Sequence, residues 1–185
     1  MKQQIELFVV VLTVAVLAGV LLPALNQARE KAMQADCISH LSQIGKGSFQ
    51  YAMSFDDWLP TSSKTSEPKW MDGNSGATFD LFRTTDLITN PAILLCPSKK
   101  GVEPAEFGKS YQGHVSYNWC DGLMGAYSTL SPIACDGMDN HADTGRFVRG
   151  DGSVGIARGS AAITWTHDKV FRDFCYKGFY TDYRF

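Results

Sequence analysis

An uncharged apolar stretch near the start of the chain constrains its fold more than any other feature. It runs from Leu7 to Leu22, and Thr13 is its only polar side chain. Its 16 residues would form a helix about 24 Å long, and extension through Leu25 brings the segment close to the ~30 Å hydrocarbon core of a bilayer. We therefore expect residues 1–28 to form an apolar stem that lies in a membrane.

Glu6 stands at the edge of this stretch. An acidic side chain inside a membrane costs roughly 2.5–3.5 kcal/mol, so we expect a functional role and a cationic partner for it. Lys2, one helical turn earlier on the same face, is one candidate partner, and the terminal amino group of a neighbouring copy is the other. The sequence leaves both open. A secretory signal peptide is disfavoured, because no A-x-A-like cleavage site follows the stretch.

After Pro23 the pattern becomes that of an amphipathic helix, with apolar residues at three- and four-residue steps. We expect one helix over about residues 3–54, kinked or locally melted at Pro23, where proline removes a backbone donor. Gly45 and Gly47 weaken it further. The expected apolar stripe is Ala28, Ala32, Ala35, Ile38, Leu41 and Ile44, and the expected polar face is Gln27, Arg29, Glu30, Gln34 and Ser42.

From Trp58 onward the chain is rich in Gly, Ser, Thr, Asn and Pro, which is typical of loops and turns. The segment Gly150-Asp151-Gly152-Ser153 lies between two apolar runs and predicts a β-hairpin. These patterns predict an α+β fold in which residues 29–185, including the amphipathic half of the helix, form a head built on a small antiparallel sheet. The predicted strands are 92–96, 115–119, 146–148, 154–157 and 162–166.

The composition limits the possible functions. With 185 residues, of which 44% are hydrophobic, the chain can form one ordinary domain and is not disordered. A formal net charge of −2 argues against a specific nucleic-acid partner, which would require a basic excess. The sequence contains no motif with catalytic geometry, such as G-x-S-x-G, so we do not expect an enzyme.

Five cysteines in a chain with an export-type stem indicate an oxidising compartment and disulfide bonds. They form no C-x-x-C motif, so neither a zinc site nor a redox dithiol is expected. A Cys120–Cys135 bond would close a loop of about 15 residues, worth about 3 kcal/mol in the chain-entropy model, and would leave Cys175 free. A Cys135–Cys175 bond and a set of buried thiols are the alternatives.

Several segments, taken in order, resemble type IV pilins and pseudopilins. The run Ile5 to Leu12 and the later Leu21-Leu22-Pro23-Ala24-Leu25 have the Glu-to-Pro spacing of that family. Four further segments resemble a pilin-like subfamily common in planctomycetes and their relatives. They are CISHLSQI (37–44), similar to "cysteine, then NLKQI"; YAMSFDDWLP (51–60), similar to the helix exit; LCPS (95–98), similar to "F-x-CPS"; and His141 with Asp151-Gly152, similar to the H-x9-DG signature.

The resemblance implies a pilin-like fold and a structural subunit of a type IV pilus-like helical homopolymer. Such a subunit sits in the lipid of the inner membrane, meets a prepilin peptidase and the inner-membrane assembly machinery, and then joins an extracellular filament at the cell surface. The family's first mature residue carries N-methylation. Its precursor has a basic leader ending in Gly, whereas this chain begins Met1-Lys2-Gln3, so the amine that faces Glu6 stays open.

The resemblance also assigns roles to particular residues. It implies an assembly role for Glu6, Lys2 and Pro23, and a Cys37–Cys96 disulfide that ties the helix to the head. Structural roles follow for the signature residues, with His141 donating to Asp151 or to a backbone carbonyl and so fixing the hairpin at Gly152.

Two other functions stay open at this stage. One is a pseudopilin of a type II secretion-like system, forming a periplasmic piston, and the other is a surface binding protein whose stem is only a membrane tether. Some pseudopilins hold calcium in a C-terminal loop, which makes Asp136, Asp139 and Asp143 weak calcium candidates. Their spacing is not that of an EF-hand, so we favour a polar loop with Asx-turns and expect no cofactor.

Overall fold

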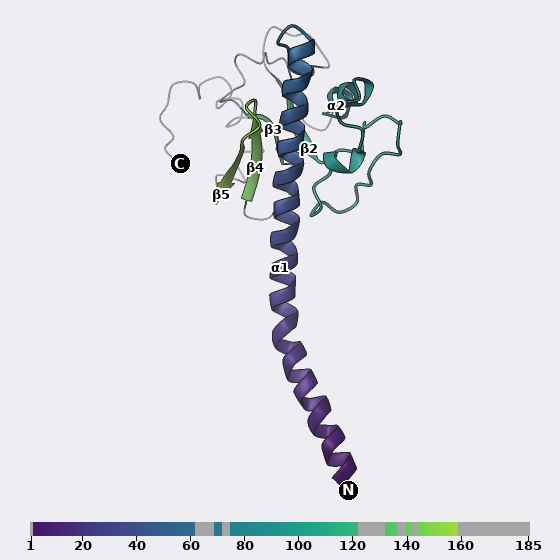
Figure 1. Ribbon diagram of the computed structural model, residues 1–185, viewed down its shortest axis with the longest axis vertical. Helices are drawn as coiled ribbons and strands as arrows, with labels where there is room; N and C mark the ends of the chain where they lie inside the picture. The colour runs from purple at the N-terminus through teal and green to yellow at the C-terminus, as the bar shows by residue number, and fades with distance from the viewer. Residues whose placement is uncertain are drawn as a thin grey trace.

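The computed structural model describes residues 2–61, 69–71, 75–121, 132–136, 140–141 and 144–158. A long N-terminal helix packs through its C-terminal half against a five-stranded antiparallel sheet, which confirms the predicted α+β fold. Figure 1 shows the helix extending far below the head, with the N-terminus at its free end.

The helix α1 spans Lys2–Ser54, in agreement with the predicted range. It stays helical through Pro23, so the expected local melting does not occur. Its axis bends in the N-terminal half, as Figure 1 shows. Residues 3–29 are exposed on every side, and the head begins to cover the helix only at Glu30.

The face of α1 that the head covers differs from the predicted stripe. Ala28, Ala32 and Ala35 are exposed, because they lie where the head covers little of the helix. Glu30 and Gln34, which we expected on the polar face, are half-buried instead. The residues of α1 that are buried against the head follow at helical spacing: Cys37, Leu41, Ile44, Gly45, Gly47, Ser48, Tyr51 and Ala52.

The sheet is a meander in which each strand pairs antiparallel with the next. The predicted strands at 146–148 and 154–157 are confirmed, the one at 115–119 is confirmed in part, and the one at 162–166 lies outside the described residues. Two strands of the sheet, β1 and β3, were not expected. The strands are β1 (Lys69–Met71), β2 (Tyr117–Asp121), β3 (Pro132–Asp136), β4 (Thr144–Arg149) and β5 (Val154–Arg158).

The predicted strand at 92–96 is wrong. Pro91–Leu94 forms a 3-10 helix, η1, because Asn90 caps it and Pro91 supplies the backbone angle of its first residue. The Asn90 side-chain oxygen accepts a hydrogen bond from the Ala92 N–H at 3.1 Å. A second unexpected helix, α2 (Ser75–Thr84), lies with η1 in the long connection between β1 and β2.

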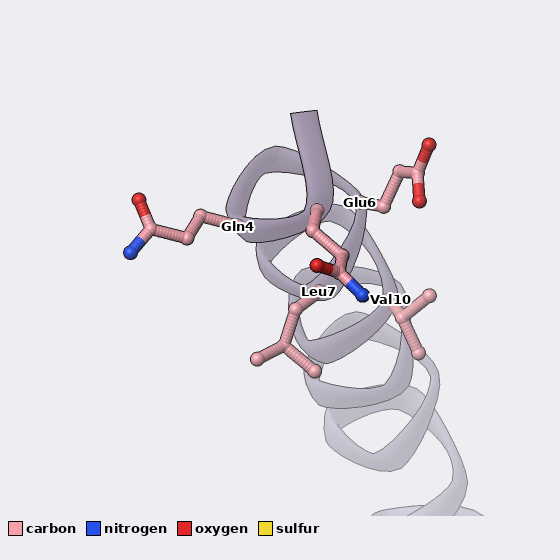
Figure 2. Close-up of a pocket in the computed structure, with 5 residues that line it drawn as sticks. Gln4, Glu6, Leu7 and Val10 are labelled. Atoms are coloured by element: carbon pink, nitrogen blue, oxygen red, sulfur yellow. The ribbon is translucent and has the colours of Figure 1, made fainter. Parts of the chain in front are cut away.

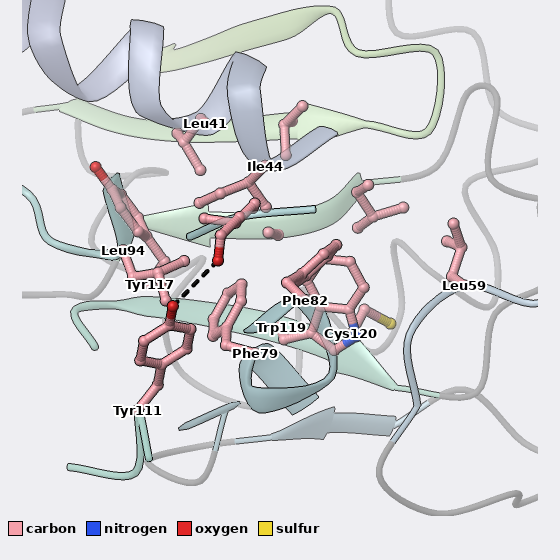
Figure 3. Close-up of a cluster of buried hydrophobic side chains, with 14 of the residues drawn as sticks. Leu41, Ile44, Leu59, Phe79, Phe82, Leu94, Tyr111, Tyr117, Trp119 and Cys120 are labelled. Atoms are coloured by element: carbon pink, nitrogen blue, oxygen red, sulfur yellow. Dashed lines mark hydrogen bonds between the residues drawn. The ribbon is translucent and has the colours of Figure 1, made fainter. Parts of the chain in front are cut away.

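The core fills the space between α1, α2 and the sheet (Figure 3). Trp119 of β2 is fully buried at its centre. The rings of Phe79 and Phe82 from α2 meet the Trp119 ring edge-on, with centroids 5.6 and 5.8 Å away. The indole N–H of Trp119 donates to the Pro60 carbonyl at 2.8 Å, which fixes the chain where it leaves α1.

Candidate functional site

The stem is the most exposed apolar surface in the described part of the chain. The large apolar side chains between Ile5 and Leu25 are 51–69% exposed. By length and composition α1 is apolar enough to cross a membrane, and none of its most apolar window is buried within the chain. Soluble monomers rarely expose so large a continuous apolar patch, so the stem needs a second apolar surface, such as lipid or another stem.

Glu6 lies on this exposed stem. Figure 2 shows Glu6 and Val10 projecting from one side of the helix and Gln4 and Leu7 from the other. These residues and Gln3 line a shallow hollow that is open to the surroundings. A carboxylate with this placement is available to a group outside its own helix.

The other predicted assembly residues are placed as follows. Pro23 lies within α1 on the exposed stem, 17 positions after Glu6. Lys2 begins the helix, but its side chain lies outside the described part of the structure. The two cationic partners considered for Glu6 therefore both stay predictions.

A second site lies inside the head, where four separate segments meet. It consists of Cys37 on α1, Cys96 after η1, Asp136 at the end of β3, and His141 between β3 and β4. All four are buried, and their sulfur, carboxylate and ring nitrogen atoms lie within 4.8 Å of one another. We call these four residues the cysteine–histidine cluster.

The distances within the cysteine–histidine cluster are short. The sulfur atoms of Cys37 and Cys96 are 2.7 Å apart. The Nε2 atom of His141 lies 3.2 Å from the Cys96 sulfur and 3.4 Å from the Cys37 sulfur. The Oδ1 atom of Asp136 lies 3.4 Å from the Cys37 sulfur. Two sulfurs, one imidazole nitrogen and one carboxylate oxygen therefore face a common centre.

The opposite edge of the His141 ring is held by the helix. Its Nδ1 atom lies 3.2 Å from a carboxylate oxygen of Glu30, which also accepts a hydrogen bond from Gln34 at 3.3 Å. The hydrogen bond to His141 is the main cause that holds the pKa of Glu30 below its usual value. Burial alone would lower the pKa of His141, but its contacts with Cys96 and Glu30 outweigh burial and raise that pKa.

The carboxylate of Asp136 also contacts residues outside the cysteine–histidine cluster. Its Oδ2 atom lies 3.4 Å from Nη1 of Arg146, and both side chains are almost completely buried. Asn140 donates to the Ser116 carbonyl at 3.0 Å and approaches Asp136 Oδ1 at 3.5 Å. Burial raises the pKa of Asp136, and the negative charge of Cys96 adds to this, while the positive charges of His141 and Arg146 oppose it.

The two sulfurs differ in their acidity. The hydrogen bond from Cys37, followed by that from His141, lowers the pKa of Cys96 to about 4. The same contact with Cys96, together with burial, raises the pKa of Cys37. The Tyr117 hydroxyl lies 3.2 Å from the Cys37 sulfur and acts against that rise. The close contact between the two sulfurs therefore shifts their pKa values in opposite directions.

The residues of the H-x9-DG signature, His141 and Asp151-Gly152, have different contacts in the structure. His141 contacts the cysteine–histidine cluster and Glu30, and it does not pair with Asp151 as expected. Asp151 instead closes the β4–β5 turn, where its Oδ1 atom accepts the Ser153 N–H at 2.8 Å. The antiparallel pairing of β4 with β5 confirms the predicted hairpin. Gly152 in its turn has a φ of +80°, a backbone conformation in which a side chain would be strained. His141 and Asp151 are separated in the sequence because strand β4, Thr144–Arg149, runs from the cysteine–histidine cluster to the turn.

The expected disulfides have different outcomes. Cys37 and Cys96 are neighbours, as the resemblance implied, but the structure holds them as thiols, so the bond itself stays a prediction. Cys120 on β2 and Cys135 on β3 are buried on neighbouring strands, where the pairing register places Cys135 opposite Asn118. Their bond also stays a prediction, and Cys175 lies outside the described residues.

The calcium candidates do not form a described loop. Asp136 is buried beside Arg146, while Asp139 and Asp143 lie outside the residues that the structure describes. Sequence reasoning missed the cysteine–histidine cluster, because its members are far apart in the chain and only the fold brings them together. The resemblance gave partial signals, because it paired Cys37 with Cys96 and singled out His141.

Comparisons with family models, with curated proteins and with solved structures found no match for this chain.

Proposed function

We propose that the chain is a structural subunit of a type IV pilus-like filament, held in the inner membrane by its stem before assembly and displayed at the cell surface afterwards. The observation that carries the proposal is the stem of α1, which the head leaves exposed on every side. The resemblance of its residues to the pilin N-terminus points the same way.

Apolar burial provides the main energy for such an assembly. Each large apolar side chain contributes roughly 1.5–3 kcal/mol when it leaves water, and the stem carries about a dozen of them. Lipid offers nearly the same burial as neighbouring stems. Transfer from the membrane into a filament is therefore nearly neutral in this contribution, and polar contacts decide order and register.

Glu6 is the residue best placed to decide register. Its carboxylate stands at the N-terminal edge of the uncharged apolar stretch Leu7–Leu22 and points away from its own helix (Figure 2). In the filament it would pair with the terminal amino group of a neighbouring copy. A contact between one surface of a subunit and a different surface of the next is heterologous, and repetition of such a contact gives an open helical polymer.

The test compares Glu6→Gln with the wild type in cells that assemble the protein. Both proteins should appear in the membrane fraction, but an immunoblot of the fraction sheared from the cell surface should contain only the wild type. Thr13→Val is the matched control, because the Thr13 hydroxyl bonds to the Val10 carbonyl of its own helix at 2.8 Å. This variant should assemble normally.

Two results would count against the proposal. If Glu6→Gln reaches the sheared fraction as well as the wild type does, the carboxylate has no part in assembly. If the wild type is absent from that fraction, a surface filament is excluded, and a periplasmic pseudopilin or a simple membrane tether explains the stem better.

A further inference from the structure

We propose that the cysteine–histidine cluster is a structural zinc site, in which Cys37, Cys96, His141 and Asp136 bind one Zn²⁺ ion. The proposal is independent of filament assembly. Zinc in proteins takes four ligands from cysteine sulfur, histidine nitrogen and carboxylate oxygen, and it prefers a tetrahedral arrangement. The four side chains supply that set, they are all buried, and their ligand atoms lie within 4.8 Å of one another.

The geometry requires only a small adjustment. With Zn–S bonds of about 2.3 Å, two sulfurs of a tetrahedral site are about 3.8 Å apart. The Cys37 and Cys96 sulfurs, now 2.7 Å apart, would separate by about 1 Å. Cys96 lies outside both α1 and the sheet, on the segment that leaves η1, but it is buried in the core, so neighbouring core side chains would adjust with it. The other distances, 3.2–3.4 Å, are close to those between zinc ligands.

The residues that contact the proposed ligands His141 and Asp136 favour a metal site over a disulfide. Zinc-bound histidines usually present one ring nitrogen to the metal and the other to a carboxylate or carbonyl. His141 has this arrangement, with Nε2 facing the sulfurs and Nδ1 facing Glu30 at 3.2 Å. Asp136 is similar, because Oδ1 faces the centre while Oδ2 is held by Arg146.

The charges balance when a divalent ion is present. Two thiolates and the Asp136 carboxylate carry three negative charges, which Zn²⁺ and the buried Arg146 guanidinium neutralise. A Cys37–Cys96 disulfide would instead remove the Cys37 thiol that lies 3.4 Å from Asp136 Oδ1. Within the part of the chain that the structure describes, that buried oxygen would then keep only Asn140, at 3.5 Å. The disulfide would also leave His141 Nε2 facing two sulfurs that have neither a proton nor a charge. Buried polar atoms without partners are unfavourable.

A zinc ion at this position would join α1 to three parts of the head. The ligands come from α1, from the segment after η1, from β3 and from the segment before β4. Structural zinc sites contribute directly to folding, since a preformed site does not exist in the unfolded chain. The ion would therefore fasten the head to the C-terminal half of the helix that carries it.

The test uses the full-length protein, purified in detergent under anaerobic conditions without chelator. Elemental analysis should give about one zinc per chain, and exchange with Co²⁺ should give the visible spectrum of tetrahedral, thiolate-bound cobalt. Cys96→Ser and His141→Ala should reduce bound zinc at least tenfold and abolish the cobalt spectrum. The matched controls Cys120→Ala and His114→Ala change a buried cysteine and an exposed histidine outside the cluster, and both should retain one zinc.

Three results would overturn the proposal. The first is wild-type protein that contains no zinc and gives no cobalt spectrum, whether its thiols are reduced or joined as a Cys37–Cys96 disulfide in a peptide digest. The second is zinc that stays bound in both cluster variants. The third is zinc that is lost equally from the two control variants. The wild-type measurement does not depend on whether any variant folds.

Discussion

Gly45 of α1 lies so close to Val148 of β4 that a Cβ atom added to the glycine would be 2.6 Å from the Val148 Cγ2 atom. The Cα atom of Gly152, in the turn after β4, would be 3.0 Å from the same added atom. Glycine is a poor helix former, but here it allows the β4–β5 hairpin to pack directly on the helix backbone. A residue that weakens the isolated helix is therefore required by the packing of the head.

Gly45→Ala should lower the free energy of unfolding of the head by about 1–2 kcal/mol. Overpacking a core costs about 1–3 kcal/mol, and the higher helix propensity of alanine offsets up to about 1 kcal/mol of this. Thermal unfolding of the full-length protein in detergent, followed by tryptophan fluorescence, to which the buried Trp119 contributes, measures the change. Gly19→Ala is the matched control in the same helix, because an added Cβ there meets nothing within 4 Å. Equal melting of the two variants would contradict this account.

The fully buried ion pair of Arg146 and Asp136 should stabilise the fold far more than a half-buried pair that water reaches. Their side chains are 2% and 3% exposed, so Arg146→Met should cost about 3–5 kcal/mol by leaving Asp136 as an unpaired buried charge. Arg83 and Asp80 approach to a similar 3.3 Å but are 30% and 22% exposed. Arg83→Met should therefore cost less than about 1 kcal/mol.

Chemical denaturation of these two variants beside the wild type gives both free energies. The measurement is made in EDTA, so that bound metal contributes to none of them. A loss for Arg146→Met as small as that for Arg83→Met would mean that the buried pair does not stabilise the head.

Asp151 should stabilise the β4–β5 turn in a pH-dependent way. Burial acts to raise the pKa of Asp151, but the hydrogen bonds from Ser153 and the positive charge of Arg149 outweigh it and hold the pKa below its usual value. A carboxyl group whose pKa is lower in the folded state stabilises the fold above its unfolded pKa of about 3.9. That contribution is lost as the pH falls through the lower folded pKa.

Asp151→Ala should therefore cost about 1 kcal/mol at pH 7, the value of a typical hydrogen bond. The difference from wild type should shrink below pH 4, where the wild-type carboxyl becomes protonated. Asp151→Asn keeps an oxygen that can accept the Ser153 N–H, so it should lose less at pH 7. Urea unfolding at several pH values tests this, and a cost that stays constant down to pH 2 would exclude a role for the charge.

The long helix and the last hairpin were predictable because their signals are local. The apolar stem and the helical spacing that follows it gave the extent of α1, and Gly152 with its neighbours gave the turn between β4 and β5. The strand β3 lacks such a signal, since all five of its residues are buried and it shows no alternation. At 92–96 the capping by Asn90 outweighed the strand-like composition and produced η1.

The cysteine–histidine cluster could not be predicted from spacing. Cys37 lies 59 residues from Cys96 and 104 residues from His141, and no C-x-x-C pair marks the site. Glu30 appeared to belong to a solvated face, because helical periodicity alone does not say how far along α1 the head begins. Only the packing of four segments reveals that Glu30 and His141 meet.

The central claim is that the exposed stems of many copies bury one another in the core of a filament. Negative-stain electron microscopy of material sheared from cells that produce the wild-type chain, labelled with gold-tagged antibody against the head, tests this most directly. We predict thin filaments that carry gold along their whole length. Gold confined to membrane fragments, with no labelled filament in the sheared material, would contradict the claim.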